Sequence, residues 1–185
     1  MEVVIDKLIK ALASINLWCR NNKLTIHTGK SEVMILTYKP FCGPLEPVML
    51  GNTVSDFVTE TKCLGIIIDN RLPWLSHIEF ICRSFGQKVN LVKRLKYLTK
   101  DTLQSIYLTS IIHTVTYCNL VWGTCSPTLL HEVEHIHARP AKIIYRLSDV
   151  SNQEVLIIAG WESINSMCKR KLLTFKFTNL SYQIS

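Results

Sequence analysis

Residues 62–78 constrain the fold more than any other stretch, because the sequence pattern changes type within it. Residues 66–68 are three consecutive isoleucines, and such a β-branched run is typical of a buried strand. Asp69 and Asn70 form a turn pair, and the φ angle of Pro73 suits the first position of a helix. Strand and turn signals precede this stretch, and helical periodicity follows it. The sequence therefore predicts a mostly helical α+β fold with a small antiparallel sheet.

The composition is that of a folded protein. The 185 residues are 48% hydrophobic and 19% charged, which is enough to bury a core in one domain or two small ones. The seven cysteines form no C-x-x-C pair, and no signal peptide is evident. Reduced thiols and an intracellular location, cytoplasmic or nuclear, are expected. Residues 102–130 lack Asp, Glu, Lys and Arg, but their polar residues favour a buried helix over a membrane span.

The part before residue 62 combines one helix with strands. Apolar residues at spacings of three and four predict an amphipathic helix over residues 3–20. Residues 32–38 have the composition of a strand. A hairpin is expected about Gly51-Asn52, with residues 48–50 and 54–58 as its arms.

The part after Pro73 is predicted to be helical. Further helices are expected from Asp101, as a cap residue, towards Trp122, over residues 127–147, near Gln153, and over residues 161–180. The first helix, which follows Pro73, has one apolar face made of Ile78, Ile81, Phe85, Val89 and Val92.

Basic residues gather in the helical part. The formal net charge of +7 favours an anionic partner such as nucleic acid, although a basic protein without such a partner has the same composition. Residues 83–100 contain six lysines and arginines and no acidic residue. Phosphate contacts and plain solvated helix faces are the two interpretations. The residues predicted to contact backbone phosphates are Arg83, Lys88, Arg94, Arg139, Lys142 and Arg146.

A literal H-E-x-x-H motif gives an alternative function. On a helix, His131 and His135 would share a face, and Glu132 would be the general base of a zinc hydrolase. The downstream G-x-x-H extension is missing, and Glu154 would be a distant third ligand. Cys118 and Cys125 could join the two histidines, but their spacing is unlike the usual paired zinc ligands. His131 and His135 are thus weak metal candidates, and the simpler interpretation is a His-rich, solvent-facing helix.

Short signatures occur in order along the chain. They are Trp18 with Asn22-Lys23-Leu24 and Lys30-Ser31; Lys62-Cys63-Leu64-Gly65 with Ile68-Asp69; Leu72, Trp74, His77 and Ile78; Ile106-Tyr107, Tyr117-Cys118 and Val121-Trp122-Gly123; and Ala138-Arg139, Ala141 and Ile143-Ile144. In this order, and as far as about residue 178, the chain resembles the C-terminal part of a non-LTR (LINE-type, jockey-like) retrotransposon reverse transcriptase.

The resemblance implies two domains. The first signature matches motif D of the polymerase palm, and the second matches the primer-grip motif E. The third resembles the L-x-W-x-x-H-I segment that opens the thumb. Residues 1–72 would then be a C-terminal palm remnant, and residues 73–185 a helical thumb-like region.

The resemblance also implies roles for single residues. Lys30 matches the motif D lysine, which is thought to protonate or neutralise pyrophosphate, and Leu64 and Gly65 match the primer grip. The alternatives are a surface lysine beside a turn and an ordinary hairpin glycine. Two departures are Cys63, where an aromatic residue is usual, and His27, where Asn is usual. A third is Pro140, which inside a helix costs on the order of 3 kcal/mol.

The catalytic aspartates of the family would precede Met1. They hold the Mg²⁺ ions of the intact enzyme, so the chain by itself is expected to bind no metal cofactor and not to be an enzyme. The expected role is limited to binding the backbone of an RNA or DNA template–primer, with no membrane partner and the oligomeric state left open. An inactive retroelement fragment and a host interaction module are the alternatives.

Overall fold

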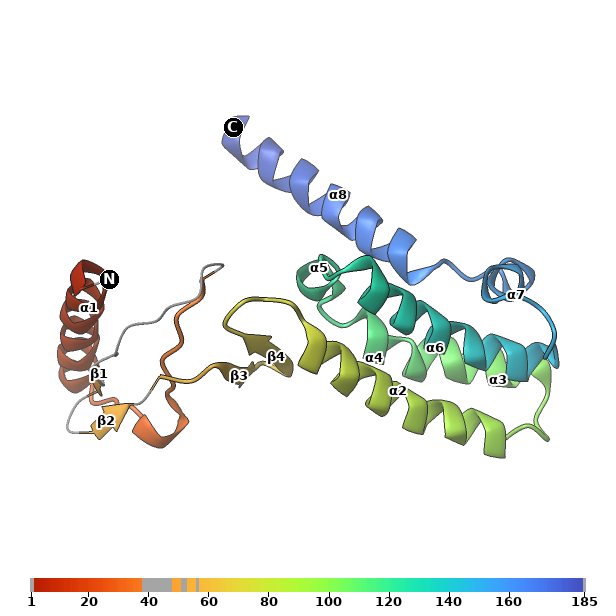
Figure 1. The fold of residues 1–185 in the computed structure, drawn as a ribbon, viewed down its shortest axis with the longest axis horizontal. Coiled ribbons are helices and arrows are strands. Elements are labelled where there is room, and N and C mark those ends of the chain that lie inside the picture. Colours follow the sequence, from red (N-terminus) through yellow and green to blue (C-terminus); the bar gives the residue numbers. More distant parts are fainter. Residues whose placement is uncertain (1, 38–47, 51–52, 56, 185) are drawn as a thin grey trace. The chain divides into compact units, whose positions relative to one another are not determined.

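The computed structural model describes residues 2–37, 48–50, 53–55 and 57–184 (Figure 1). The chain divides into two compact units, Met1–Leu72 and Pro73–Ser185. The boundary lies within residues 62–78, where the sequence pattern changes type. Helices dominate and the strands form small antiparallel hairpins, which confirms the predicted fold class.

The first unit has one long helix and two hairpins. Helix α1 spans Glu2–Asn21, and a short 3-10 helix, η1, covers Thr28–Lys30. Strands β1 (Val48–Leu50) and β2 (Thr53–Ser55) pair antiparallel, which confirms the expected hairpin and its first arm. The second arm covers residues 53–55 and not the predicted 54–58, because Phe57 instead forms a parallel bridge with Val33. Strands β3 (Glu60–Cys63) and β4 (Ile66–Asp69) form the second antiparallel hairpin, and β4 contains the three isoleucines.

The strand predicted over residues 32–38 is wrong for its described part, residues 32–37; residue 38 lies outside the described residues. Val33 forms only an isolated parallel bridge with Phe57, and its carbonyl accepts a hydrogen bond from Val58 N at 2.8 Å. Thr37 N donates instead to Asn70 O at 3.0 Å. Because the two ends of this segment bond to different neighbours, no continuous ladder forms.

The second unit is a helical bundle. Its long helices α2 and α6 pack side by side, and α6 also packs against α7 and α8. The apolar face predicted for the first helix is confirmed, since each of its five residues is buried in α2. The elements are α2 (Leu75–Arg94), α3 (Lys100–Ile106), the π-helix η2 (Tyr107–Ile111), α4 (His113–Thr116), α5 (Asn119–Trp122), α6 (Pro127–Tyr145), α7 (Asn152–Ala159) and α8 (Ile164–Ile184).

Three helix starts differ from the prediction, and one of them is that of α8, which begins at Ile164 and not at Trp161. Helix α2 begins at Leu75 and not at Pro73, because Trp74 takes a left-handed conformation (φ 67°) with its side chain buried. Helix α3 is capped by Thr99 and not by Asp101. Thr99 Oγ1 accepts a hydrogen bond from Thr102 N at 3.4 Å, and Asp101 lies in the first turn, where the helix dipole favours a carboxylate.

The single helix predicted from residue 101 to 122 is also wrong, because the segment is broken. It passes from α3 through the π-helix into α4, and then breaks before α5 at Cys118, which has a φ angle of 47°. Within the described ranges, no helix combines the length and the apolar content that a membrane span requires.

A buried polar cluster joins η2, α6 and the connection between α7 and α8. The hydroxyl of Tyr107 lies 2.6 Å from Nδ1 of His137, and Nε2 of His137 lies 3.1 Å from the carbonyl oxygen of Glu162. A carbonyl only accepts, so Nε2 carries the proton, and Tyr107 donates to Nδ1. The ring of Trp161 stacks on Tyr107 with centroids 3.9 Å apart. Burial lowers the pKa of His137 to about 4, so the imidazole is neutral in the folded protein.

Candidate nucleic-acid interface

Helix α2 presents cations on its outward surface. Arg83 and Arg94 are exposed and lie eleven residues apart, on the face opposite the buried one. Lys88 lies towards the flank of the helix, and its Nζ donates to Thr114 Oγ1 at 2.6 Å. The predicted outward position of the two arginines is therefore confirmed, whereas Lys88 is partly engaged by a neutral hydroxyl on α4.

Helix α6 carries a second row of cations. Arg139 and Lys142 lie three residues apart on α6, so they share a face, and Arg146 directly follows the last residue of the helix. Arg139 and Arg146 are exposed, and Lys142 is half-buried. His131 and His135 continue the same face towards the N-terminal end of the helix and are also exposed.

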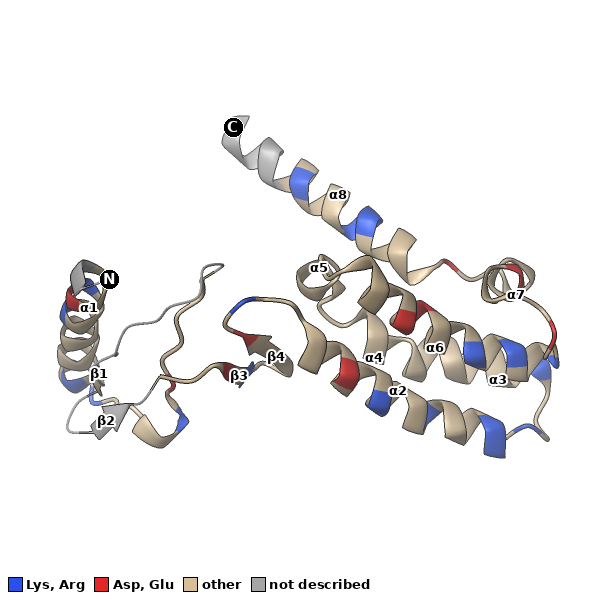
Figure 2. Cartoon of the chain, in the orientation of Figure 1, with Lys and Arg blue, Asp and Glu red and all other residues tan. Residues whose placement is uncertain are grey.

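The two rows lie on neighbouring helices. Figure 2 shows lysine and arginine along the later part of α2 and of α6, with both helices running in the same direction. In the described part of the chain, the ion pairs are Asp6–Lys10 and Glu162–Arg170, and no cation of the two rows takes part. Because these charges have no acidic partner there, they can neutralise phosphates without first breaking an ion pair.

The β3–β4 hairpin presents the residues that were predicted to form a primer grip. Leu64 and Gly65 are its two-residue loop, and both have positive φ angles, 48° and 86°. Glycine adopts this conformation freely, whereas a leucine there costs about 1–2 kcal/mol. The Leu64 side chain is 85% exposed. The structure thus places both residues at the tip of a hairpin, with the leucine facing outward from a strained backbone.

Lys30 is the last residue of the 3-10 helix and is exposed. Its backbone N–H donates to His27 O at 3.0 Å, which closes the turn that precedes residue 32. The structure therefore presents this lysine on the surface of the first unit.

The H-E-x-x-H motif lies on α6, but the described residues give it no third ligand. Among the residues that the structure describes, no three or more His, Cys, Asp or Glu side chains gather closely enough to hold a metal ion. Glu154 belongs instead to a capping box, in which it accepts from Ser151 N at 3.0 Å while Ser151 Oγ accepts from Glu154 N. The described structure therefore does not support a zinc site built on His131 and His135.

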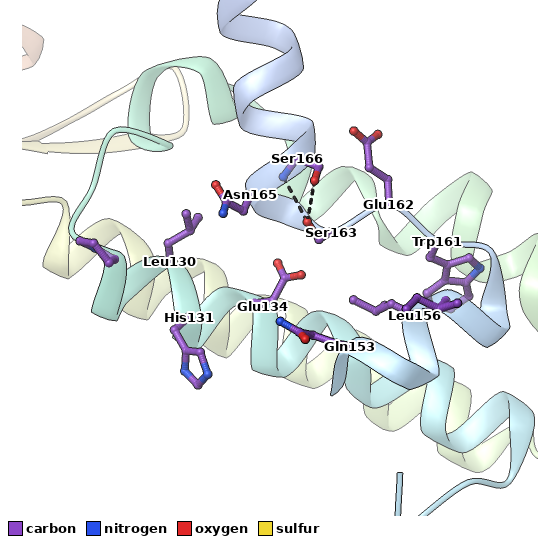
Figure 3. A pocket seen from close by; sticks show the side chains of 12 residues that line it. Leu130, His131, Glu134, Gln153, Leu156, Trp161, Glu162, Ser163, Asn165 and Ser166 are labelled. Atoms are coloured by element: carbon purple, nitrogen blue, oxygen red, sulfur yellow. Dashed lines mark hydrogen bonds between the residues drawn. The ribbon is translucent and has the colours of Figure 1, made fainter. Parts of the chain in front are cut away.

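A pocket of about 560 Å³ lies among α6, α7 and the start of α8 (Figure 3). Leu130, Leu156 and Trp161 give it apolar walls, and Glu134 points into it. Glu134 Oε2 accepts a hydrogen bond from Ile164 N at 2.8 Å, so the carboxylate caps the first turn of α8. Burial raises the pKa of Glu134 above its ordinary value. Because the Glu134 carboxylate already caps α8, this pocket is a weaker candidate for a functional site than the basic rows on α2 and α6.

Two basic residues that we did not select from the sequence also lie near Arg146. Lys96 and Lys100 line the same small pocket as Arg146 does, where the α2–α3 connection meets the end of α6. The sequence feature that could have indicated Lys96 and Lys100 was the absence of acidic residues from positions 83–100. Sequence spacing could not place them beside Arg146, because nearly fifty residues separate the two segments.

Comparison with known proteins shows a distant similarity. The chain is 21% identical over 137 residues, or 72% of its length, to the probable RNA-directed DNA polymerase from transposon BS of Drosophila melanogaster. The match spans about 15% of the length of that polymerase. No protein-family model and no solved structure matches the chain. The chain is thus distantly similar to a part of a transposon polymerase.

Proposed function

We propose that the chain is the end of the palm and the thumb of a non-LTR, jockey-like retrotransposon reverse transcriptase, and that it binds the backbone of a template–primer duplex. The observation that carries this proposal is the pair of cation rows on α2 and α6. None of the cations in these rows forms an ion pair with a described residue. The similarity to a transposon polymerase and the order of the signatures support the same assignment.

The proposed contacts are electrostatic. Arginine and lysine on rigid helices can each neutralise a phosphate and release condensed counterions, without reading the bases. Arg83 and Arg94 would contact one stretch of backbone from α2, and Arg139, Lys142 and Arg146 another from α6. Lys88 would contribute less because its ammonium group already donates to Thr114. Recognition would then follow the A-form shape of the duplex and not its sequence.

The first unit would contribute two positions. Leu64 and Gly65, at the tip of the β3–β4 hairpin, would approach the primer strand as a primer grip does. Lys30 would protonate or neutralise the pyrophosphate in the intact enzyme. The Mg²⁺ ions of that enzyme need a set of carboxylates, and the described residues provide no such group. We therefore assign no metal-dependent step to this chain.

Charge removal on the two rows tests the proposal. The variant R83Q/R94Q/R139Q should bind an RNA–DNA hybrid about tenfold or more weakly in fluorescence anisotropy, because it loses three phosphate contacts. Its far-UV circular dichroism should stay unchanged, since the three side chains are exposed.

The control removes cations that already have acidic partners. K10Q/R170Q breaks the Asp6 and Glu162 ion pairs and should leave hybrid binding within about twofold. Equal losses in both variants would mean that only net charge matters, and this would refute a defined interface. Absence of binding by the unaltered chain would favour an inactive fragment or a host interaction module.

A further inference from the structure

A small basic pocket lies at one end of the helical unit. It has a volume of about 270 Å³ and is formed by residues 96–103 on one side and 143–146 on the other. Its charged lining residues are Lys96, Lys100 and Arg146. Three basic residues therefore line one cavity that is smaller than a usual drug-sized site.

One of the two lysines that line this pocket is held in place. Lys100 Nζ lies 4.0 Å from the centroid of the Tyr145 ring, which is a cation–π contact. The Tyr145 hydroxyl lies 3.2 Å from Gln104 Oε1 and 3.4 Å from Ala159 O, so the ring itself is fixed. A fixed ammonium loses less conformational entropy when it meets an anion.

The arginine is held at a backbone position that normally belongs to glycine. Arg146 follows the end of α6 with a φ angle of 57°, and the bonds from Leu147 N to Lys142 O and from Arg146 N to Ile143 O form a Schellman motif. Helix α7 ends in the same motif with Gly160 at the equivalent place. The left-handed conformation is unfavourable for arginine, so its presence suggests a use for the side chain.

The positive charge in the pocket has no counter-charge in the described structure. No acidic residue lines it, and its three cations form none of the ion pairs found among the described residues. Asp149, which follows α6 closely in sequence, lines a different pocket with Glu154. Like charges gathered in one cavity repel one another, and a bound anion would remove that repulsion.

We propose that this pocket binds a phosphate monoester through Lys96, Lys100 and Arg146. A terminal phosphate carries more negative charge than a backbone diester, and its free oxygens can accept bonds from two lysines and the arginine fork together. The ligand is either the 5′-phosphate end of a nucleic-acid strand or a free small phosphate. Only the first source rests on the proposed function, because the cavity itself does not require a duplex.

The test compares phosphate-bearing ligands on the full chain. Inorganic phosphate should shift the backbone amide NMR signals of residues 96–103 and 143–147. An RNA–DNA hybrid with a 5′-phosphate should bind several-fold more tightly than the same hybrid with a 5′-hydroxyl. R146G should remove this preference and weaken phosphate binding about tenfold. K100Q should do the same without changing the backbone position, and the matched charge control K93Q should keep both effects, since Lys93 does not line the pocket.

The outcomes separate this inference from the proposed function. Phosphate-induced shifts without any gain from the 5′-phosphate support the pocket and identify a free phosphate as its ligand. A gain that R146G abolishes supports the strand end. If neither hybrid binds but phosphate still shifts these residues, the duplex proposal fails and the pocket stands. The inference is overturned if phosphate leaves these signals unmoved, or if R146G and K93Q behave alike.

Discussion

At the scale of single residues, α6 and α7 end in the same backbone conformation with different residues, Arg146 and Gly160. Both residues occupy the left-handed position that ends a helix, with φ angles of 57° and 66°. R146G should raise the free energy of unfolding by about 0.5–1 kcal/mol, because relief of backbone strain exceeds the entropy that glycine adds to the unfolded chain. Urea denaturation monitored by circular dichroism measures this change.

The reciprocal substitution provides the control. G160A should lower the free energy of unfolding by about 1 kcal/mol, since a Cβ there meets no atom within 4 Å and only the backbone conformation is unfavourable. A loss of stability in R146G would contradict the view that Arg146 is retained for its side chain.

A second residue-scale prediction concerns acid stability. His137 is fully buried, and its pKa falls to about 4 from an ordinary value of 6.5. The unfolded state therefore gains a proton below about pH 6.5 that the folded state does not take up until about pH 4. Stability from this group is complete above pH 6.5 and is lost as the pH falls, by about 2 kcal/mol at pH 5.

Urea unfolding at pH 7.5 and pH 5.0 measures this loss. The variant H137Q has no titrating imidazole, so its loss over the same interval should be smaller by about 2 kcal/mol. An imidazole NMR titration of the unaltered protein gives a check that does not depend on a variant. A midpoint for His137 near 6.5 would contradict the buried, neutral ring.

Some features of single residues in α2 and α3 could be predicted from the sequence, and others could not. The buried face of α2 was predictable, because burial of Ile78, Phe85 and Val92 follows from a 3.6-residue period. The left-handed Trp74 and the Thr99 cap were not predictable, since both depend on how the chain enters its helix. Pro73 and Asp101 are typical helix-start residues, but α2 begins two residues after Pro73 and the α3 cap lies two residues before Asp101.

At the scale of elements, α2 should contribute most of its stability through one face. Phe85 is fully buried and meets Tyr107 edge to face, with centroids 6.3 Å apart, whereas Phe80 on the same helix is 40% exposed. F85A should cost about 3–5 kcal/mol through lost burial and a cavity. F80A should cost well under half as much. Thermal and urea unfolding of the two variants compare them, and equal losses would show that the helix packs differently.

The element scale also shows where a periodic pattern misleads. Residues 101–122 have helical periodicity throughout, yet they form three α-helices and the π-helix η2. The break at Cys118 contains no proline or glycine, so no helix-breaking residue in the sequence predicted it. Residues 32–37 have a strand composition, but among the described residues they form a single bridge, between Val33 and Phe57. Composition predicts a preference, whereas pairing depends on neighbours distant in sequence.

At the scale of the whole molecule, the main feature is the division of the chain into two compact units. The boundary between Leu72 and Pro73 separates a hairpin-bearing unit from a helical one. The sequence indicated this change of pattern and the two cation rows. It could not indicate that α2 and α6 would be neighbours, or that Lys96 and Lys100 would share a pocket with Arg146. The proposed function depends at this scale on the placement of positive charge on the helical unit.

The salt dependence of hybrid binding tests the central claim most directly. The affinity of the unaltered chain for an RNA–DNA hybrid would be measured between about 50 and 200 mM salt, and log K plotted against log salt. Contacts from the cation rows of α2 and α6 predict a steep decline, with a slope of about −3 to −5. Absence of binding, or a slope near zero, would contradict a backbone-binding interface on these two helices.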